Sequence, residues 1–473
     1  MMQPGRIQSI AFGSHRFNNV HFVGIGGVGM SGIAEVLINL GFSVSGSDQN
    51  ESKTLQRLRD LGATISTGHT AGAVESANVV VVSAAIDESN PELIRARELR
   101  IPVIPRAEML GELMRFRRGV AVAGTHGKTT TTSLTASVLA EGGMDPTFVI
   151  GGVLNATGSN AKLGTGEYLV AEADESDGSF LLLQPVIAVV TNIDEDHMET
   201  YDGDPGRLKA AFVEFLHHLP FYGVAIVCID DPILADLAPE LGRTVVTYGL
   251  SEGADIRATN VVQNGRRMRF KVEGIGAAET FELNLPGVHN VRNALAAIAV
   301  GHELNVDLPS SKRALTQFAG IGRRFNVYEK VACDSGQCTL IDDYGHHPTE
   351  LEATIAAARA GWPDARLIVG FQPHRYSRTR DLFDEFVQVL SAADGAVLCD
   401  VYPAGEEPIA NADSRALCRA LRARGVYEPI YVHTPDQIGE AMASIVEDQD
   451  VVLISGAGSI GTLAPSLAAG GLQ

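Results

Sequence analysis

The chain alternates short apolar runs with glycine-rich or polar turns and with longer segments of helical periodicity. Apolar runs of about four to eight residues between turn residues are typical of buried β-strands. Strands that alternate with helical segments predict a parallel α/β fold. The predicted strands lie at residues 18–25, 43–48, 77–85, 118–124, 167–174, 186–192, 224–230, 339–344, 365–372, 394–400 and 450–455.

Residues 255–287 follow a different pattern, because apolar and polar side chains alternate there with a period of two. This pattern predicts antiparallel strands beside the parallel ones, and therefore a mixed sheet in the middle of the chain. At about 100–200 residues per domain, a chain of 473 residues is long enough for several domains. We expect three α/β domains, at residues 1–108, 109–323 and 324–473, of which the first and last are Rossmann-like.

The charge and cysteine content narrow the class of protein. A net charge of −20 argues against binding to nucleic acid or to an anionic membrane. The five cysteines include no CxxC pair, which fits buried thiols in a reducing compartment. The first 20 residues lack the apolar core of a signal peptide, and no apolar stretch of about 20 residues follows. We therefore expect a cytoplasmic protein without membrane insertion.

The first glycine-rich loop lies in HFVGIGGVGMSGIAEVL, residues 21–37, between a predicted strand and a predicted helix. Its glycines satisfy G-x-G-x-x-G, and an aspartate follows about 20 residues later, as in dinucleotide-binding units. The pattern specifies a diphosphate, which a UDP group provides as well as NAD does, and a tight turn without ligand is the alternative. The candidate ligand-binding residues of this domain are Gly24, Gly26, Gly27, Gly29, Asp48, His69 and Ser83. For His69 and Ser83, a plain turn role is the alternative.

The second glycine-rich loop lies in VAGTHGKTTTT, residues 122–132, again between a predicted strand and a predicted helix. The usual phosphate-loop spacing G-x-x-x-x-G-K-[ST] is not met, because Val122 stands where the first glycine belongs. A lysine at the loop can still place its charge on the β- and γ-phosphates, and a threonine hydroxyl can bind Mg²⁺. This predicts a P-loop ATPase-like central domain. Its candidate nucleotide-binding residues are Gly124, Thr125, His126, Gly127, Lys128, Thr129 and Thr130.

Two later strands end in acidic segments, YLVAEADESDGS and VIAVVTNIDEDHMETY. Open α/β sheets place their ligands at the carboxyl ends of strands, and Mg²⁺ prefers carboxylate oxygens. Glu172 is favoured because it lies inside the apolar end of a strand, where an unpaired carboxylate would be costly. His197 lies between acidic turns. We expect Thr129, Glu172 and His197 to hold the metal.

Several longer motifs carry a resemblance to a known family. GTHGKTTT, EADESDGSF, TNIDEDHMETY, GVHNVRNALAAIA, GRRF, DDYGHHPTE and FQPHRYSRTRD occur in this order over nearly the whole chain. Together they resemble the ATP-dependent Mur ligases. The resemblance implies an amide ligase of peptidoglycan precursor synthesis that joins L-alanine to the lactyl carboxylate of UDP-N-acetylmuramate through an acyl phosphate. It implies ATP and Mg²⁺, with Mn²⁺ able to replace Mg²⁺, and a monomer or homodimer.

The resemblance also assigns roles to single residues. Lys128, Glu172 and His197 would act on the transferring phosphoryl group. His289 and Asn293 would contact adenine, while Arg324 would reach the ATP phosphates and Asp342 the ribose. The alanine pocket would consist of Tyr344, His346, His374, Arg375 and Arg378, with His374 as a candidate acceptor of the ammonium proton and His347 without a defined role.

Three other functions are possible. A related ligase attaches a ready-made tripeptide to the same sugar nucleotide, but the motifs GIGGVGMSG, DDYGHHP and FQPHRYSRT favour the alanine enzyme. A nicotinamide dehydrogenase would use the first glycine loop and leave the second without a role. A non-catalytic nucleotide switch would not explain the arginines and histidines of the last domain.

Overall fold

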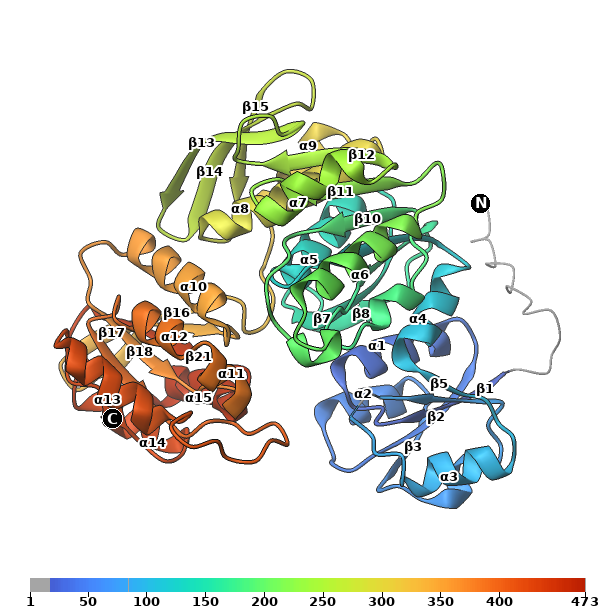
Figure 1. Ribbon diagram of the computed structural model, residues 1–473, viewed down its shortest axis with the longest axis horizontal. Helices are drawn as coiled ribbons and strands as arrows, with labels where there is room; N and C mark the ends of the chain where they lie inside the picture. The colour runs from blue at the N-terminus through green and yellow to red at the C-terminus, as the bar shows by residue number, and fades with distance from the viewer. Residues whose placement is uncertain (1–17, 84, 473) are drawn as a thin grey trace, which may run out of the picture. The chain divides into compact units, whose positions relative to one another are not determined.

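The computed structural model describes residues 18–83 and 85–472 (Figure 1). Residues 1–17, from which we expected no signal peptide, lie outside the described part. The described chain divides into two compact units. Unit 1 holds the residues up to Thr259 together with Lys271–Phe281 and Arg292–Gln317; unit 2 holds Asn260–Phe270, Glu282–Val291 and the residues from Phe318 onward. Three sheets are present in the described residues, and they confirm the predicted three-domain α/β architecture.

The first sheet is wholly parallel and has the strand order β3-β2-β1-β4-β5, so its order reverses between β1 and β4. Such a reversal opens a ligand-binding crevice at the carboxyl ends of the strands. Its strands are β1 Asn19–Val23, β2 Ser43–Asp48, β3 Thr64–Thr67, β4 Val79–Val82 and β5 Val103–Pro105. Its helices are α1 Val28–Asn39, α2 Lys53–Asp60, α3 Pro91–Glu98 and α4 Arg106–Met114.

The second sheet has the strand order β15-β14-β13-β12-β11-β10-β6-β9-β7-β8, with parallel pairing from β13 through β7 and an antiparallel β7–β8 pair. The strands predicted within residues 255–287 are present as β13–β15. The strands are β6 Arg118–Ala123, β7 Thr147–Leu154, β8 Ser159–Lys162, β9 Tyr168–Glu172, β10 Ile187–Val190, β11 Val224–Cys228, β12 Thr244–Gly249, β13 Ile256–Asn264, β14 Arg267–Glu273 and β15 Glu279–Leu283. The helices are α5 Lys128–Glu141, α6 Pro205–His217, α7 Pro232–Leu237, α8 Val288–Glu303 and α9 Leu308–Thr316.

The third sheet has the order β16-β17-β21-β18-β19-β20, and only the β16–β17 pair is antiparallel. Successive residues of its strands enter two different cores, as Ile368 and Val369 do, because side chains alternate across a strand. The strands are β16 Asn326–Cys333, β17 Gly336–Asp343, β18 Leu367–Phe371, β19 Gly395–Leu398, β20 Ile430–Tyr431 and β21 Val451–Ser455. The helices are α10 Pro348–Gly361, α11 Tyr376–Asp381, α12 Phe383–Leu390, α13 Ser414–Arg424, α14 Asp436–Ala443 and α15 Leu463–Gly470.

Within unit 1, helix α1 belongs to the first domain but packs on the β7–β8 hairpin of the second. A Cβ on Gly32 would lie 3.2 Å from Ala161 Cβ, so the helix backbone approaches the hairpin closely. The amide of Asn160 donates to the carbonyl of Val28 at 2.5 Å and to Ser31 Oγ at 3.3 Å. The hairpin therefore holds the N-terminal turn of α1, directly after the first glycine loop.

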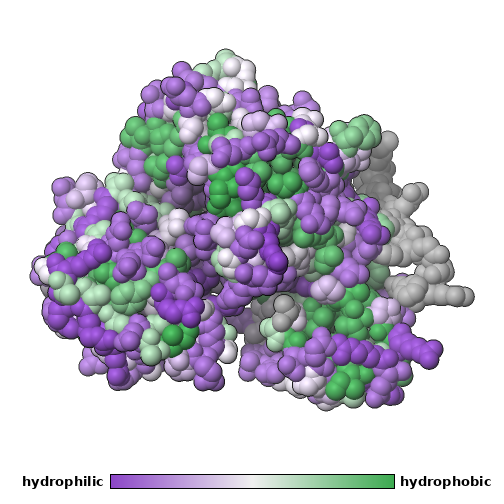
Figure 2. Space-filling model, viewed as in Figure 1, coloured by the Kyte–Doolittle hydropathy of each residue, from purple (hydrophilic) through white to green (hydrophobic). Residues whose placement is uncertain are grey.

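The cysteines are buried, as the sequence predicted. All five cysteines are buried and free. The face shown in Figure 2 is largely hydrophilic, with separate apolar patches. Among the described residues, we find no helix whose length and apolar character would let it cross a bilayer.

Candidate functional site

The phosphate loop connects β6 to α5, as its sequence context predicted. Gly124 has φ +123°, and a Cβ there would collide with Thr191 Oγ1. Gly127 precedes α5 with φ +83°, and a Cβ there would lie 2.6 Å from Asn293 Oδ1. Both positions therefore need glycine, because an L side chain would be strained and would also lack space.

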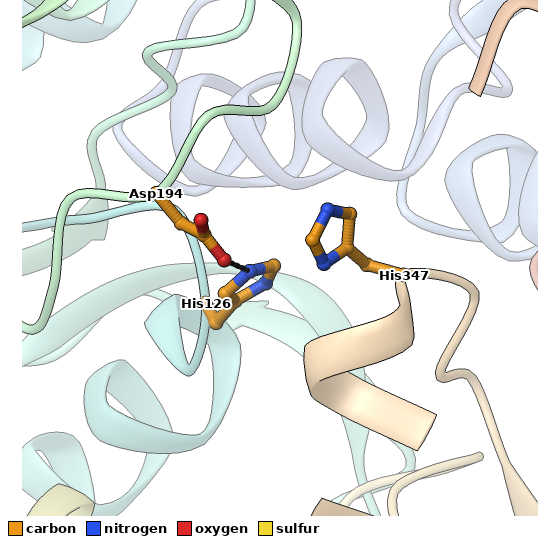
Figure 3. Close-up of side chains that lie close together, drawn as sticks. All are labelled: His126, Asp194 and His347. Atoms are coloured by element: carbon orange, nitrogen blue, oxygen red, sulfur yellow. Dashed lines mark hydrogen bonds and ion pairs between the residues drawn. The ribbon is translucent and has the colours of Figure 1, made fainter. Parts of the chain in front are cut away.

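The segment after β10 is hydrogen-bonded to this loop. Thr191 Oγ1 donates to the carbonyl of His126 at 2.6 Å, and the N–H of His126 donates to Asn192 Oδ1 at 2.9 Å. The N–H of Asp194 donates to Thr125 Oγ1 at 2.9 Å. The ring of His126 contacts the carboxylate of Asp194 at 3.0 Å, as Figure 3 shows. The segment after the neighbouring strand therefore fixes the backbone of the phosphate loop.

Lys128 is the first residue of α5 and lies in a buried ion pair. Its Nζ donates to the carbonyls of Gly124 and Thr125 at 2.7 and 3.0 Å and to Glu175 at 2.8 Å. Burial lowers the pKa of Lys128, but the carboxylates of Glu175 and Asp174 raise it by more than burial lowers it, so Lys128 stays charged. Burial raises the pKa of Glu175 to about 7, against the opposing effect of Lys128. Lys128 therefore stays positively charged beside Glu175, whose carboxyl group takes up a proton near pH 7.

Two of the predicted metal ligands, Thr129 and Glu172, are in direct contact. Thr129 Oγ1 donates to Glu172 Oε2 at 3.2 Å, and the other carboxylate oxygen of Glu172 accepts from the N–H of Gly151 at 2.5 Å. His197 has left-handed backbone (φ 54°), and its Nε2 lies 3.5 Å from Asp196 Oδ2. A hydroxyl and carboxylates at the carboxyl ends of β9 and β10 form a donor set that suits Mg²⁺.

Asn293 lies on α8 against the phosphate loop. Its Oδ1 accepts from Thr131 Oγ1 at 3.1 Å, and it is buried, as is Thr130. Its neighbour Arg292 donates to Asp230 Oδ2 at 2.7 Å, which attaches α8 to the segment after β11. In unit 2, a Cβ on Gly287 would lie 2.5 Å from His289 Cε1, so this glycine leaves room for the imidazole.

The first glycine loop has the predicted position between β1 and α1. Gly24 has φ +81°, and its N–H donates to the carbonyl of Ser47 at 2.9 Å. Ser83, from the segment after β4, lies beside it, since a Cβ on Gly24 would be 3.3 Å from Ser83 Cβ. The N–H of Gly26 donates to Asp48 Oδ2 at 2.9 Å. Asp48, one of the predicted ligand-binding residues, thus binds the loop itself. Gly27 precedes α1, and no side chain caps the helix there.

His69 belongs to a buried polar network. Its Nδ1 lies 2.8 Å from Ser47 Oγ, which donates to Glu92 Oε2 at 2.6 Å. His21 Nε2 contacts the same carboxylate oxygen at 3.4 Å, and the N–H of Thr70 donates to the other at 3.1 Å. Although burial raises the pKa of Glu92, the hydrogen bonds from His21, Ser47 and Thr70 lower it overall. The network fixes His69 beside the end of β2.

In unit 2, three predicted alanine-pocket residues lie in a row of aromatic rings that contact one another, the first two contacts being edge to face. The ring centroids of Tyr344 and His346 are 5.3 Å apart, and those of His346 and His374 are 5.5 Å apart. His374 then stacks on Tyr402 at 5.4 Å. His347, also labelled in Figure 3, precedes α10 and accepts from the N–H at residue 349 at 3.4 Å.

Two arginines border this row. Arg378 is 6% exposed, and its Nη1 lies 3.4 Å from His374 Nδ1. Arg375 has φ 69°, and its Nη1 lies 3.8 Å from Glu406 Oε1. Burial lowers the pKa of His374 to about 4, and His346 and the two arginines lower it further, so His374 is neutral at pH 7.

Arg323 and Arg324 reach the other end of the row. Their guanidinium carbons lie 5.1 and 4.8 Å from the ring centroid of Tyr344, which is cation–π geometry. Arg323 Nε is 3.6 Å from Asp342 Oδ1. Burial raises the pKa of Asp342 to about 6, against the opposing effect of Arg323.

Comparisons with known proteins agree with this geometry. Three family models match: the Mur ligase family catalytic domain at residues 19–118, the Mur ligase middle domain at 122–301 and the Mur ligase glutamate ligase domain at 323–458. The UDP-N-acetylmuramate–L-alanine ligase of Methylococcus capsulatus is 60% identical over 96% of this chain and 97% of its own. The chain belongs to the Mur ligase family.

Two further Mur ligases are similar over nearly the whole chain. The UDP-N-acetylmuramate–L-alanine ligase of Stenotrophomonas maltophilia is 60% identical over 97% of this chain and 96% of its own. The crystal structure of the UDP-N-acetylmuramate–alanine ligase of Thermotoga maritima has a TM-score of 0.80 at 29% identity, covering 95% of this chain and 98% of that one. The resemblance stated from the motifs is thus confirmed at the level of the family.

Sequence reasoning did not single out some residues of this Mur ligase. Glu175 appeared only as one member of an acidic run, and its pairing with Lys128 depends on the fold of the segment after β9. Glu92, in the first turn of α3, was not distinguished by the sequence analysis, yet it is fully buried. A hydrophobic pattern cannot show that a first-turn carboxylate points inward.

The stability of the ligand-free Mur ligase should depend on pH through Glu175. Its pKa in the folded chain is about 7, against a usual 4.5. Between about pH 4.5 and 7, the folded chain retains a proton that the unfolded chain has lost, so the free energy of unfolding decreases as the pH rises. We expect Glu175→Gln to reduce the change of unfolding free energy with pH, measured by urea unfolding at several pH values. A variant with the same slope as the unaltered protein would contradict the raised pKa.

Proposed function

We propose that this Mur ligase joins L-alanine to the lactyl carboxylate of UDP-N-acetylmuramate, with hydrolysis of ATP to ADP and phosphate, in peptidoglycan precursor synthesis. The observation that carries the proposal is the pair of glycine loops in unit 1. One loop has Lys128 and the acidic strand ends around it, and the other starts α1 at a sheet reversal. The ligases of Methylococcus and Stenotrophomonas carry the names of these substrates.

The first step transfers the γ-phosphoryl group of ATP to the lactyl carboxylate. The bond from phosphorus to the ADP oxygen breaks and a bond to the carboxylate oxygen forms, which converts a poor electrophile into an acyl phosphate. Lys128 would neutralise the transferring group, and Asn293 and His289 would hold the adenine. Thr129, Glu172 and His197 would hold Mg²⁺, which would offset the phosphate charges when bound.

The second step joins the amine to the activated carbonyl. The nitrogen of L-alanine attacks, a tetrahedral intermediate forms, and the carbon–oxygen bond to phosphate breaks. The amine must lose its proton first. The candidate acceptor is His374, which is neutral at pH 7, although its lowered pKa makes it a weak base. Arg375 and Arg378 would hold the alanine carboxylate, since a guanidinium matches a carboxylate with two parallel hydrogen bonds.

The remaining parts of the proposal concern organisation. We propose domain boundaries at residues 1–108, 109–323 and 324–473, a monomer or homodimer, and action in the cytoplasm. Asp48, His69 and Ser83 would bind the UDP-linked substrate at the first glycine loop. Arg324 would contact the ATP phosphates and Asp342 the ribose, with Tyr344 and His346 in the alanine pocket.

An ADP-release assay tests the proposed function. With UDP-N-acetylmuramate and ATP present, we expect L-alanine to give faster turnover than glycine or L-serine, and the tripeptide L-alanyl-γ-D-glutamyl-meso-diaminopimelate to give none. Faster turnover with the tripeptide would reject the alanine assignment in favour of the related tripeptide ligase. The dehydrogenase alternative predicts binding of NADH, for which we expect no heat in calorimetry.

A further inference from the structure

Arg106 lies between the two glycine loops of unit 1. It is the first residue of α4, and a Cβ on Gly29 would be 3.0 Å from its Nη1 and 3.1 Å from its Cδ. The guanidinium therefore lies against the first turn of α1. On its other side, Nη2 donates to Asp174 Oδ2 at 3.4 Å, just after β9. The side chain of Arg106 is 24% exposed, so a ligand can reach it.

Asp174 holds Arg106 in this position. Ser176 Oγ donates to its Oδ1 at 2.7 Å, which leaves Oδ2 for the guanidinium. Arg106 is thus held beside α1 by a carboxylate that follows a strand of the domain with the other glycine loop.

The first glycine loop needs such a cation if it is to hold a diphosphate. The N-terminus of a helix supplies free N–H groups and about half a positive charge. Here, however, the carboxylate of Asp48 already accepts from the N–H of Gly26 at 2.9 Å. This negative charge opposes a second anion at the same place. A guanidinium beside Gly29 offsets it, and its fork of N–H groups matches phosphate oxygens.

We propose that Arg106 binds the diphosphate of the UDP-linked substrate, together with the first turn of α1, and that Asp174 is its positioning residue. This rests on the proposed function, because it needs a UDP-linked substrate. The chemistry recognised is a diphosphate. The lactyl carboxylate of the same substrate is the alternative anion, and the ligands of the test distinguish the two.

The test measures binding to Arg106→Ala and Arg106→Lys by calorimetry, with UDP, uridine and UDP-N-acetylmuramate as ligands. We expect the alanine variant to lose on the order of 10- to 100-fold in affinity for UDP and for UDP-N-acetylmuramate, because a charge-assisted contact is lost. Affinity for uridine, which has no diphosphate, should stay unchanged. The difference in affinity between UDP and uridine should therefore be smaller in the alanine variant than in the unaltered protein. The UDP affinity of the lysine variant should lie between those of the alanine variant and the unaltered protein, because lysine keeps the positive charge but not the paired N–H groups of the guanidinium.

Arg115→Ala is the matched control. Arg115 lies at the other end of α4, its side chain is 63% exposed, and it pairs with Glu112 at 3.4 Å. The Arg115→Ala variant should bind all three ligands as the unaltered protein does. The KM for ATP should stay unchanged in every variant. Unchanged UDP affinity in Arg106→Ala would overturn the proposal, and so would a loss confined to UDP-N-acetylmuramate. Absence of alanine-dependent turnover in the unaltered protein would instead count against the proposed function, while UDP binding would still test Arg106.

Discussion

Replacement of Lys128 by alanine is expected to lower alanine-dependent ADP release by at least about 10²–10³-fold, as loss of one charged contact to a transition state does. Lys128 is the cation at the start of α5, and the two loop carbonyls that it binds aim it across the phosphate loop. Binding of UDP-N-acetylmuramate should stay within about threefold of normal, because the first glycine loop is a separate site. Steady-state kinetics and calorimetry measure the two effects.

Loss of the lysine has a second consequence that must be separated from catalysis. Glu175 would remain buried without its cation, and such a group destabilises a fold by roughly 3–5 kcal/mol unless it takes up a proton. The double variant Lys128→Met/Glu175→Gln removes both charges and should recover the melting temperature while remaining inactive. Lys162→Ala is the control, since Lys162 is an exposed lysine of the same unit that pairs with Asp145 at 2.7 Å. Near-normal turnover in the folded double variant would refute the role of Lys128.

The second large effect concerns Arg378. We expect Arg378→Ala to lower kcat/KM for L-alanine by on the order of 10²-fold, mainly through KM, because it removes the buried guanidinium that we propose binds the alanine carboxylate. The KM values for ATP and UDP-N-acetylmuramate should not change. Arg378→Lys should recover only part of the loss, because an ammonium cannot form the two parallel contacts.

Arg380→Ala provides the control on the same helix. Arg380 is exposed and pairs with its neighbour Asp381 at 2.7 Å, so its removal should leave all three KM values unchanged. An unchanged KM for alanine in Arg378→Ala would mean that the alanine carboxylate binds elsewhere. A matching rise in the KM for ATP would instead indicate a general disturbance of unit 2.

Several strand positions could be predicted closely. β2, predicted at 43–48, has these bounds, and β6 and β21 differ from their predictions by a single residue. The strands that were not predicted include β7 and β12 inside the second sheet and β3 and β8 at sheet edges. β3 has a mostly exposed TIST sequence and β8 (SNAK) has no apolar run, so pairing with a neighbouring strand, and not a hydrophobic pattern, fixes these two.

The candidate site was predictable where a motif needs a particular backbone, and less so where side chains meet across long sequence separations. The glycines at 124 and 127 follow from strand–loop–helix geometry, whereas their contacts with Thr191 and Asn293 required the fold. Asp48 shows a different limit. Its distance from the first loop matches a ribose ligand, yet its carboxylate accepts from Gly26, because the same position at the end of β2 lies beside the loop. Spacing alone does not separate these two partners.

The packing of α1 on the β7–β8 hairpin has a thermodynamic consequence. The helix that begins at one glycine loop shares its N-terminal contacts, through Asn160, with the domain that carries the other. Fraying of this turn would expose the surfaces of both α1 and the hairpin. A ligand that binds only when the turn is formed raises the free energy of that opening by RT ln(1 + [L]/Kd). We therefore expect a ligand at the first glycine loop to protect the β7–β8 hairpin of the next domain against local opening as well.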